Sequence, residues 1–102
     1  KAIDYISEHI SQDLSLDAIA SALFVYKYYF AHIFKEYTNT SPHRYILKKR
    51  LVLSKQFIEE GFPITEVFAK CGFSDYTHFF RAFKNEFGIT PKQFYASISL
   101  QP

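Results

Sequence analysis

An internal repeat places the strongest constraint on the fold of this 102-residue sequence. Apolar residues of the first half recur in the second half after a shift of 48 positions, and the shift becomes 49 further along the chain. The pairs at a shift of 48 are Leu16 and Ile64, Ile19 and Val67, Leu23 and Cys71, and Val25 and Phe73. Those at a shift of 49 are Phe30 and Phe79, Phe34 and Phe83, Lys35 and Lys84, Pro42 and Pro91, and Tyr45 and Phe94. A repeat of this length indicates two copies of one supersecondary unit, with one residue inserted in the second copy.

The apolar residues have the spacing of α-helices. They recur three and four positions apart, as in Phe79, Phe83 and Phe87, which places them on one side of a helix. No segment of useful length alternates between apolar and polar residues, so strands are not expected. We therefore predict an all-α fold of seven helices, which span residues 2–10, 16–23, 27–37, 42–60, 64–71, 75–87 and 91–97.

Residues typical of helix ends flank several of these segments. Serine and threonine side chains accept hydrogen bonds from the free N–H groups of a first turn, and proline favours the position after such a cap. Glycine is typical of the residue just beyond a helix. The predicted N-caps are Ser15, Ser41, Ser74 and Thr90, and the predicted C-terminal glycines are Gly61 and Gly88.

Each copy of the repeat is a short helix, a tight turn and a longer helix, which is the layout of a helix-turn-helix motif. The extra residue of the second copy lies at or just after its turn. We predict one domain over residues 1–102, with a first helix-turn-helix subdomain at 1–41, a linker helix at 42–60 and a second subdomain at 61–102. The linker helix extends about 28 Å at the usual rise per residue.

The segment ITEVFAKCGFSDYTHFFRAFKNEFGITPKQFY, residues 64–95, resembles the signature region of the AraC/XylS family of bacterial transcription regulators. The shared features are a Gly-Phe turn, a capped helix with an aromatic-Phe-x-Arg-x-Phe-Lys core, and Gly-x-Thr-Pro followed by aromatic residues. The segment LSLDAIASALFVYKYYFAHIFKEYTNTSPHRYI, residues 14–46, resembles the family more weakly but in register. Two motifs in register are more specific than one, and together they account for nearly the whole chain.

The resemblance implies a DNA-binding domain from the C-terminal half of a longer regulator, whose N-terminal part is a sensor or a receiver domain and carries any dimer contacts. The start at Lys1, without a methionine, is consistent with such a fragment. The resemblance also implies that the second helix of each motif, the recognition helix, enters the major groove of double-stranded DNA. Successive major-groove entries lie roughly 34 Å apart along B-DNA. The length of the linker helix, together with the reach of the side chains, comes close to this spacing. RNA polymerase is expected as a further partner if the regulator activates.

In the second motif, the resemblance gives as candidate DNA contacts Tyr76, Thr77, Phe80, Arg81 and Lys84. Arg81 is the strongest of them, because arginine pairs with O6 and N7 of guanine through two hydrogen bonds. The alternatives for Arg81 are a phosphate contact without base specificity and a surface ion pair with an acidic residue such as Glu86. Tyr76 and Thr77 lie in the first turn, where free N–H groups favour phosphate. Asp75 would oppose a phosphate there, so we expect it to start the helix.

In the first motif, the corresponding candidates are Lys27, Tyr28, Ala31, His32 and Lys35. His32 stands where the family often has arginine, and it can donate to a base or a phosphate. Tyr28 either contacts a sugar or a thymine methyl group, or is a partly buried surface aromatic residue. Lys48, in the basic run Lys48, Lys49 and Arg50, is a further phosphate candidate, and such contacts position a protein without reading sequence. The alternative for this run is a solvated helix face.

Three further residues depart from the family pattern. Tyr26 replaces a serine-like cap of the first recognition helix, so we expect a looser helix start. Phe68 replaces a small residue and needs space in the short helix of the second motif, by a tilt of that helix or against Ala69 and Cys71. Phe80 replaces a small polar residue on the face turned toward DNA, where it contacts thymine methyl groups or marks a protein contact.

Composition and spacing argue against several other classes of protein. A net charge of +2 permits nucleic-acid binding without requiring it. Cys71 is the one cysteine, which excludes an internal disulfide and suits the cytoplasm, and we expect a buried, unreactive thiol. His9, His43 and His78 lack the spacing of metal ligands, so no metal or cofactor is expected. No apolar run approaches the roughly 20 residues of a membrane span, and no nucleophile with a base, carboxylate pair or phosphate-binding glycine loop points to an enzyme.

Two functions from different classes follow from these patterns. The first is sequence-specific binding of double-stranded DNA by a bacterial transcription regulator. The second is a helical protein-interaction module that keeps the fold with weakened DNA contacts and uses the aromatic residues Tyr26, Tyr28, Tyr29 and Phe80. Duplex binding measured across salt concentrations distinguishes them, because only DNA binding depends steeply on salt.

Overall fold

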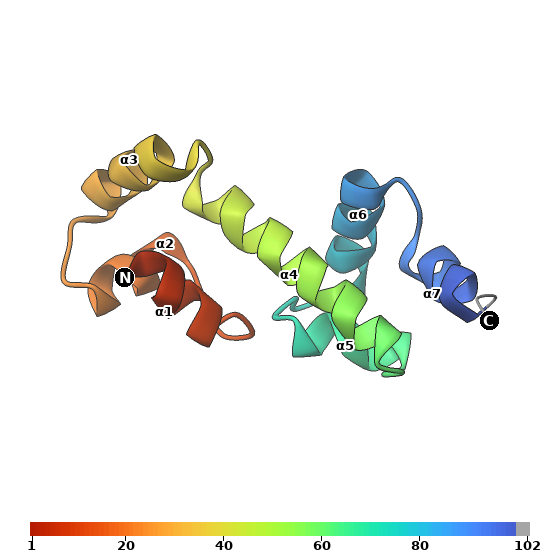
Figure 1. The fold of residues 1–102 in the computed structure, drawn as a ribbon. Coiled ribbons are helices and arrows are strands. Elements are labelled where there is room, and N and C mark those ends of the chain that lie inside the picture. Colours follow the sequence, from red (N-terminus) through yellow and green to blue (C-terminus); the bar gives the residue numbers. More distant parts are fainter. Residues whose placement is uncertain (100–102) are drawn as a thin grey trace. The chain divides into compact units, whose positions relative to one another are not determined.

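The computed structural model describes residues 1–99, and every regular element in that range is a helix (Figure 1). In chain order the helices are α1 (Ala2–Glu8), α2 (Leu16–Ala22), α3 (Lys27–Thr38), α4 (Pro42–Glu59), α5 (Ile64–Lys70), α6 (Tyr76–Phe87) and α7 (Pro91–Ser99). The prediction of an all-α fold with seven helices is therefore confirmed for the described residues. The helix ends lie within two residues of those predicted.

The chain divides into two compact units, Lys1–Lys49 and Arg50–Pro102, with the boundary inside α4. Each unit has a core of its own. Buried apolar residues of the first unit are Ile6, Leu14, Ile19, Ala20, Phe30, Phe34 and Ile46. Those of the second unit are Leu51, Ile58, Val67, Cys71, Phe73, Phe79, Ala82 and Phe83. Burial of these apolar side chains is the main driving force for folding each unit.

In the first unit, α2 packs against both α1 and α3. Ile6 from α1 and Ile19 from α2 are fully buried. The rings of Phe30 and Phe34 lie 5.6 Å apart on α3, and Tyr45 meets Phe34 edge-on at 5.3 Å. Phe30 and Phe34, one helical turn apart, therefore hold α3 against the core of the first unit.

In the second unit, α6 packs against α5 and α7, and its phenylalanines form the centre of the core. Phe79 and Phe83 are fully buried, with ring centroids 5.7 Å apart. Phe87 meets Phe83 at 4.7 Å, and Phe94 from α7 meets it at 5.9 Å. The Nζ atom of Lys55 lies 3.8 Å from the centroid of the Phe87 ring, a cation–π contact that covers the edge of this core.

The turns of the two motifs have the same backbone hydrogen bonds. After α2, the N–H of Phe24 donates to Ser21 O and that of Val25 donates to Ala20 O. After α5, the N–H of Gly72 donates to Ala69 O and that of Phe73 donates to Phe68 O. Both are Schellman motifs, in which the first residue beyond the cap takes a left-handed conformation. The structural repeat thus extends to the backbone of each turn.

The predicted N-cap Ser74 is wrong, because Asp75 caps α6. Asp75 has an extended backbone, and its carboxylate accepts a hydrogen bond from His78 N at 2.8 Å. Val25 precedes the N-cap Tyr26 directly, whereas Ser74 separates Phe73 from Asp75. Ser74 is therefore the inserted residue of the second copy, and it lies between the turn and the cap.

The other predicted helix ends are confirmed. The hydroxyl of Ser15 accepts from Ala18 N at 3.1 Å, and that of Ser41 accepts from Arg44 N at 3.2 Å. Thr90 accepts from Gln93 N, and the Gln93 side chain accepts from Thr90 N, which makes a reciprocal capping box. The two predicted C-terminal glycines have positive φ angles: Gly61 lies beyond α4 and Gly88 ends α6.

Candidate nucleic-acid interface

The second recognition helix, α6, has an inner and an outer face. Phe79, Ala82 and Phe83 are buried, while the outer face carries the predicted contacts Thr77, Phe80, Arg81 and Lys84. Positions three and four apart share one side of a helix, so these four residues form one surface. Thr77, Arg81 and Lys84 are exposed, and Phe80 is half-buried. We call these four residues the α6 outer face.

Arg81 and Lys84 give the α6 outer face its charge. Within residues 1–99 neither side chain forms an ion pair, so the alternative pairing of Arg81 with Glu86 is not found. Asn85 lies one turn beyond Arg81 and brings no carboxylate to this face. The guanidinium and the ammonium are therefore available to an anionic ligand.

Tyr76 lies at the start of α6 and is partly packed. Its ring lies 5.9 Å from Phe68 and from Phe79, and 6.2 Å from Phe80. The volume of Phe68 is thus accommodated against Tyr76, whereas the sequence suggested a tilt of the helix or contacts with neighbouring small residues. Tyr76 is 38% exposed, so part of this residue remains accessible at the start of α6.

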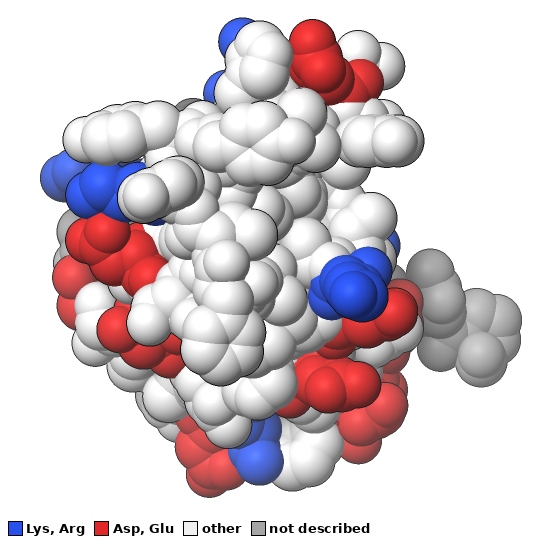
Figure 2. Space-filling model, turned by 90° about the vertical axis from the view of Figure 1, so that its left-hand side faces the viewer, with Lys and Arg blue, Asp and Glu red and all other residues white. Residues whose placement is uncertain are grey.

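Exposed aromatic residues surround the turn and the start of α3 in the first unit. Phe24 is 94% exposed, Tyr26 87%, Tyr28 77% and Tyr29 62%. Figure 2 looks onto the side where Figure 1 shows α2 and α3, and the middle of that surface is free of Lys, Arg, Asp and Glu. The three tyrosines were predicted from the sequence as candidate surface residues, whereas Phe24 was not. The signal for it was present, because Phe24 aligns with Gly72 at a shift of 48.

The outer face of α3 repeats the geometry of α6 with different side chains. Tyr28, His32 and Lys35 are exposed and Ala31 is half-buried, while Phe30 and Phe34 are buried on the opposite side. We call Tyr28, Ala31, His32 and Lys35 the α3 outer face. Tyr26 is the N-cap of α3, and its side chain makes no capping hydrogen bond, in agreement with the expected looser start.

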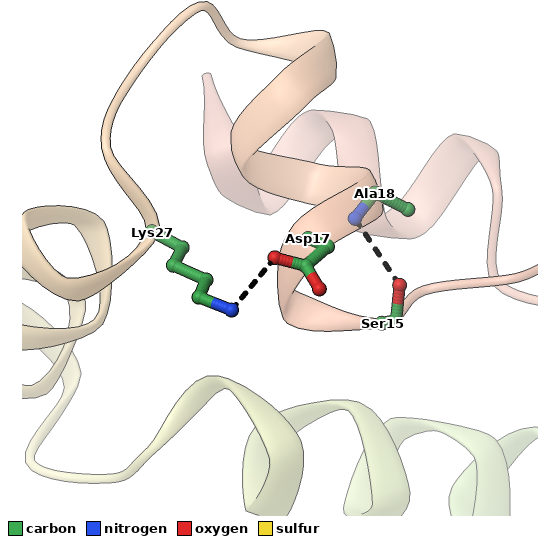
Figure 3. A network of polar contacts seen from close by, with 4 residues as sticks. All are labelled: Ser15, Asp17, Ala18 and Lys27. Carbon is green, nitrogen blue, oxygen red and sulfur yellow. Dashed lines mark hydrogen bonds and ion pairs between the residues drawn. The ribbon is translucent and has the colours of Figure 1, made fainter.

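Lys27 is held by an acidic residue of the preceding helix. Its Nζ lies 3.0 Å from Asp17 Oδ1, and Figure 3 shows this pair beside the Ser15 cap of α2. The hydrogen bond and the negative charge of Asp17 raise the pKa of Lys27. A DNA phosphate would have to compete with Asp17 for this ammonium group. The second copy has Thr65 and Tyr76 at the matching positions, so the sequence repeat gave no indication of the pair.

Three more groups contribute to the charge distribution of the first unit. His32 Nε2 lies 3.4 Å from Glu36 Oε2, one turn along the exposed side of α3. Lys48 is exposed on α4, and Lys49 places its ammonium 5.5 Å from the ring centroid of Tyr45. Among residues 1–99, no group of three or more His, Cys, Asp and Glu residues could hold a metal ion.

A groove of about 460 Å³ lies on the other side of α3. It is lined by Lys1, Ala2, Ile3, Leu23, Val25, Phe30, Ile33, Phe34, Tyr37 and Thr38. On α3, Ile33 and Tyr37 project on the side opposite to Tyr28 and Lys35, because their positions differ by about half a helical turn. The groove is therefore separate from the α3 outer face. Sequence spacing placed Ile3 and Ile33 in helices but did not show that they border an open groove.

Two copies of a helix, a tight turn and a second helix with an exposed outer face define a double helix-turn-helix protein. A family model described as a helix-turn-helix domain matches residues 19–97. The chain belongs to this helix-turn-helix family and, within it, to the AraC/XylS type, as the resemblance predicted.

Individual relatives agree with this assignment. The chain is 35% identical over 92 residues to the probable transcriptional regulator LumQ of Photobacterium leiognathi. The aligned region covers 89% of this chain and 37% of LumQ. An AraC-type transcriptional regulator of Chromobacterium violaceum matches at a TM-score of 0.85 and 30% identity, over 99% of this chain and 91% of that structure. The C-terminal domain of AraT, a response regulator from Geobacillus stearothermophilus, matches at a TM-score of 0.90 and 28% identity, over 94% of this chain and 81% of that structure. The chain spans about a third of the length of the curated relatives it matches.

No helix among residues 1–99 has the length and apolar character needed to cross a membrane.

Proposed function

We propose that this chain binds double-stranded DNA sequence-specifically, as the DNA-binding part of a bacterial transcription regulator in the cytoplasm. The observation that carries the proposal is the repeated motif with two exposed outer faces, of which the α6 outer face presents Arg81 and Lys84 without ion-pair partners among residues 1–99. An α-helix fits the major groove of B-DNA, where base edges carry a full pattern of donors and acceptors. The AraC-type relative from Chromobacterium violaceum is described as containing a DNA-binding domain.

Each predicted contact has a role in this proposal. Arg81 reads a base or binds a phosphate, and Lys84, Lys35 and Lys48 bind phosphates. Thr77 and Tyr76, at the start of α6, contact the sugar-phosphate backbone of the DNA. Phe80 adds an apolar contact to the DNA. On α3, the matching contacts with DNA come from Tyr28, Ala31 and His32. Lys27 reaches a DNA phosphate if its ammonium group leaves Asp17. RNA polymerase and a second subunit, bound through other parts of the whole protein, are further proposed partners.

The test is equilibrium binding of this chain to duplexes at several salt concentrations. A site selected from a random duplex library should bind on the order of a thousandfold more tightly than a scrambled duplex. Affinity falls as salt rises, and each phosphate contact contributes about 0.9 to the steepness of log affinity against log salt. Lys84→Ala should therefore make this dependence shallower by about one. Arg81→Ala should weaken binding to the selected site at least about fivefold.

The matched control is Lys1→Ala, which removes one positive charge from the groove side of α3 rather than from an outer face. It should leave the slope and the affinity for the selected site nearly unchanged. No binding to any duplex at low salt would reject the proposal. It would instead favour a protein-interaction module, for which the exposure of Tyr26, Tyr28 and Tyr29 is the supporting observation.

A further inference from the structure

The outer faces of α3 and α6 can be compared position by position. A shift of 49 relates both the first and the last residues of the two helices, and both end in a left-handed residue, Asn39 and Gly88. The same shift relates the four residues of each face, so each pair occupies the same place on its helix. The pairs are Tyr28 and Thr77, Ala31 and Phe80, His32 and Arg81, and Lys35 and Lys84.

The clearest difference is the position shared by His32 and Arg81. Arg81 is the one arginine on either recognition helix, and it forms no ion pair within residues 1–99. Its guanidinium can donate two parallel hydrogen bonds to O6 and N7 of guanine. His32 presents a single imidazole, and its Nε2 already faces the Glu36 carboxylate at 3.4 Å. The first unit therefore has no guanidinium on its outer face, and Lys35 does not distinguish the two faces because Lys84 occupies the matching position of α6.

The second difference concerns apolar contacts. Tyr28 is 77% exposed, and Ala31 lies one turn further on the same side of α3. Their ring and methyl group form an accessible apolar surface. In the second unit, Phe80 is half-buried because its ring lies beside that of Tyr76, which itself packs on Phe68. The apolar side chain of the α6 outer face is thus partly engaged within its own unit.

The charge near Tyr28 is also compensated. Lys27 Nζ lies 5.3 Å from the centroid of the Tyr28 ring, but it is paired with Asp17. The start of α3 therefore offers a phenol ring with little net charge beside it, whereas α6 offers a guanidinium. A weakly charged apolar surface fits the methyl group of thymine, which alanine and aromatic side chains contact in the major groove.

We infer that the two units read different base chemistry: Arg81 of the second unit reads guanine, and Tyr28 and Ala31 of the first unit read thymine methyl groups. The preferred site is then asymmetric, with guanine in the major-groove segment bound by α6 and A·T pairs in the segment bound by α3. This inference rests on the proposed function, because it assigns specificity to the same two outer faces.

The experiment uses the selected duplex with single base analogues. Replacing guanine by 7-deazaguanine removes the N7 acceptor, and replacing thymine by uracil removes the methyl group. We expect one 7-deazaguanine in the guanine segment to weaken binding at least about fivefold. Each uracil in the other segment should weaken binding about fourfold, the value for one buried methyl group.

Variants assign each effect to its unit. Arg81→Ala removes the guanidinium and both of its donors, so it should lose the sensitivity to 7-deazaguanine and retain the sensitivity to uracil. Tyr28→Ser keeps a hydroxyl but lacks the ring, so it should lose sensitivity to uracil and retain the sensitivity to 7-deazaguanine. In a new selection, His32→Arg should enrich guanine in the segment that was rich in A·T pairs.

The outcomes separate the two proposals. A specific site that contains guanine contacts in both segments, or binding unaffected by either analogue, would overturn the asymmetric readout and leave the proposed function standing. Failure to enrich any duplex in the selection would overturn the proposed function and this inference together.

Discussion

Phe24 has a backbone conformation that its side chain does not favour. Its φ angle is +58°, in the left-handed region, where the equivalent turn of the second unit has Gly72 at +97°. A left-handed conformation costs a residue with a Cβ atom roughly 1–2 kcal/mol. Because the side chain is 94% exposed, little burial offsets this cost. The first turn is therefore less stable than its counterpart at this one position.

Phe24→Gly is expected to stabilise the chain by about 0.5–1 kcal/mol, since the relief of strain exceeds the entropic cost of a glycine in the unfolded chain. Urea unfolding followed by circular dichroism measures the change. Phe24→Ala is the matched control, because it removes the exposed ring and keeps the Cβ atom. It should give less than half of the gain. A lower stability of Phe24→Gly than of the unmodified chain would contradict this account of the turn.

Cys71 is fully buried in the second unit, and this burial raises the pKa of its thiol to about 12, although the nearby Arg50 opposes the change. The ordinary value is 9.0, so the folded protein keeps a proton that the unfolded chain loses. The resulting contribution to stability is complete below pH 9 and is lost as the pH rises from about 9 to about 12.

The same burial makes Cys71 slow to react. At pH 8, a thiol-specific reagent should label the folded chain at least about a hundredfold more slowly than the urea-unfolded chain, because the thiolate is the reactive form. Ser11→Cys in a Cys71→Ala background supplies an exposed thiol as the control, and it should react at the same rate in both states. Equal rates for Cys71 in the folded and unfolded chains would show that its thiol is accessible.

The two recognition helices begin differently. Asp75 caps α6 through its carboxylate, whereas Tyr26 at the matching position of α3 makes no capping hydrogen bond. A serine, asparagine or aspartate N-cap stabilises a helix by about 1 kcal/mol relative to alanine. We expect Tyr26→Ser to raise the free energy of unfolding by about this amount, because Tyr26 is exposed and loses little packing.

Asp75→Ala is the complementary change, and it should lower the free energy of unfolding by about 1 kcal/mol. Thermal or urea unfolding of both variants tests the pair. Tyr26→Ala separates the cap from the loss of the aromatic ring, since alanine cannot accept the hydrogen bond. If Tyr26→Ser and Tyr26→Ala have equal stability, the new hydroxyl does not cap α3.

The elements of the fold were predictable because each depends on local rules. Helical spacing and the caps at Ser15, Ser41 and Thr90 depend on residues within a few positions of one another. The cap of α6 was misassigned to Ser74 because serine and aspartate both favour that role, and only the backbone shows which side chain reaches the first turn. Phe24 was missed since its signal lies in its alignment with Gly72 rather than in its own type.

The candidate site was predictable in its positions and less so in its partners. The repeat placed Arg81 and Lys84 on an exposed side of α6, opposite to Phe79 and Phe83. The repeat gave no indication that Asp17 pairs with Lys27, because Asp17 lies in α2 and Lys27 lies in α3 after the turn. Contacts between elements depend on the packing of α2 against α3, which residue spacing within one helix does not define.

For the molecule as a whole, the main feature is the division of the buried residues into two separate sets. Phe34 belongs to the core of the first unit, and Phe83, its partner in the repeat, belongs to that of the second. Replacing either phenylalanine by alanine removes a buried ring and leaves a cavity, at a cost of about 3–5 kcal/mol. The two changes therefore destabilise different sets of buried contacts by similar amounts.

We expect Phe83→Ala to accelerate amide hydrogen exchange mainly in α5, α6 and α7, and Phe34→Ala to accelerate it mainly in α2 and α3. Protected amides exchange through openings of the unit that contains them, so each cavity should act on its own unit first. Each variant is the control for the other, because the substitution and the repeat position are the same. Equal acceleration throughout residues 1–99 in both variants would instead show that the whole chain opens as one cooperative unit, despite its two cores.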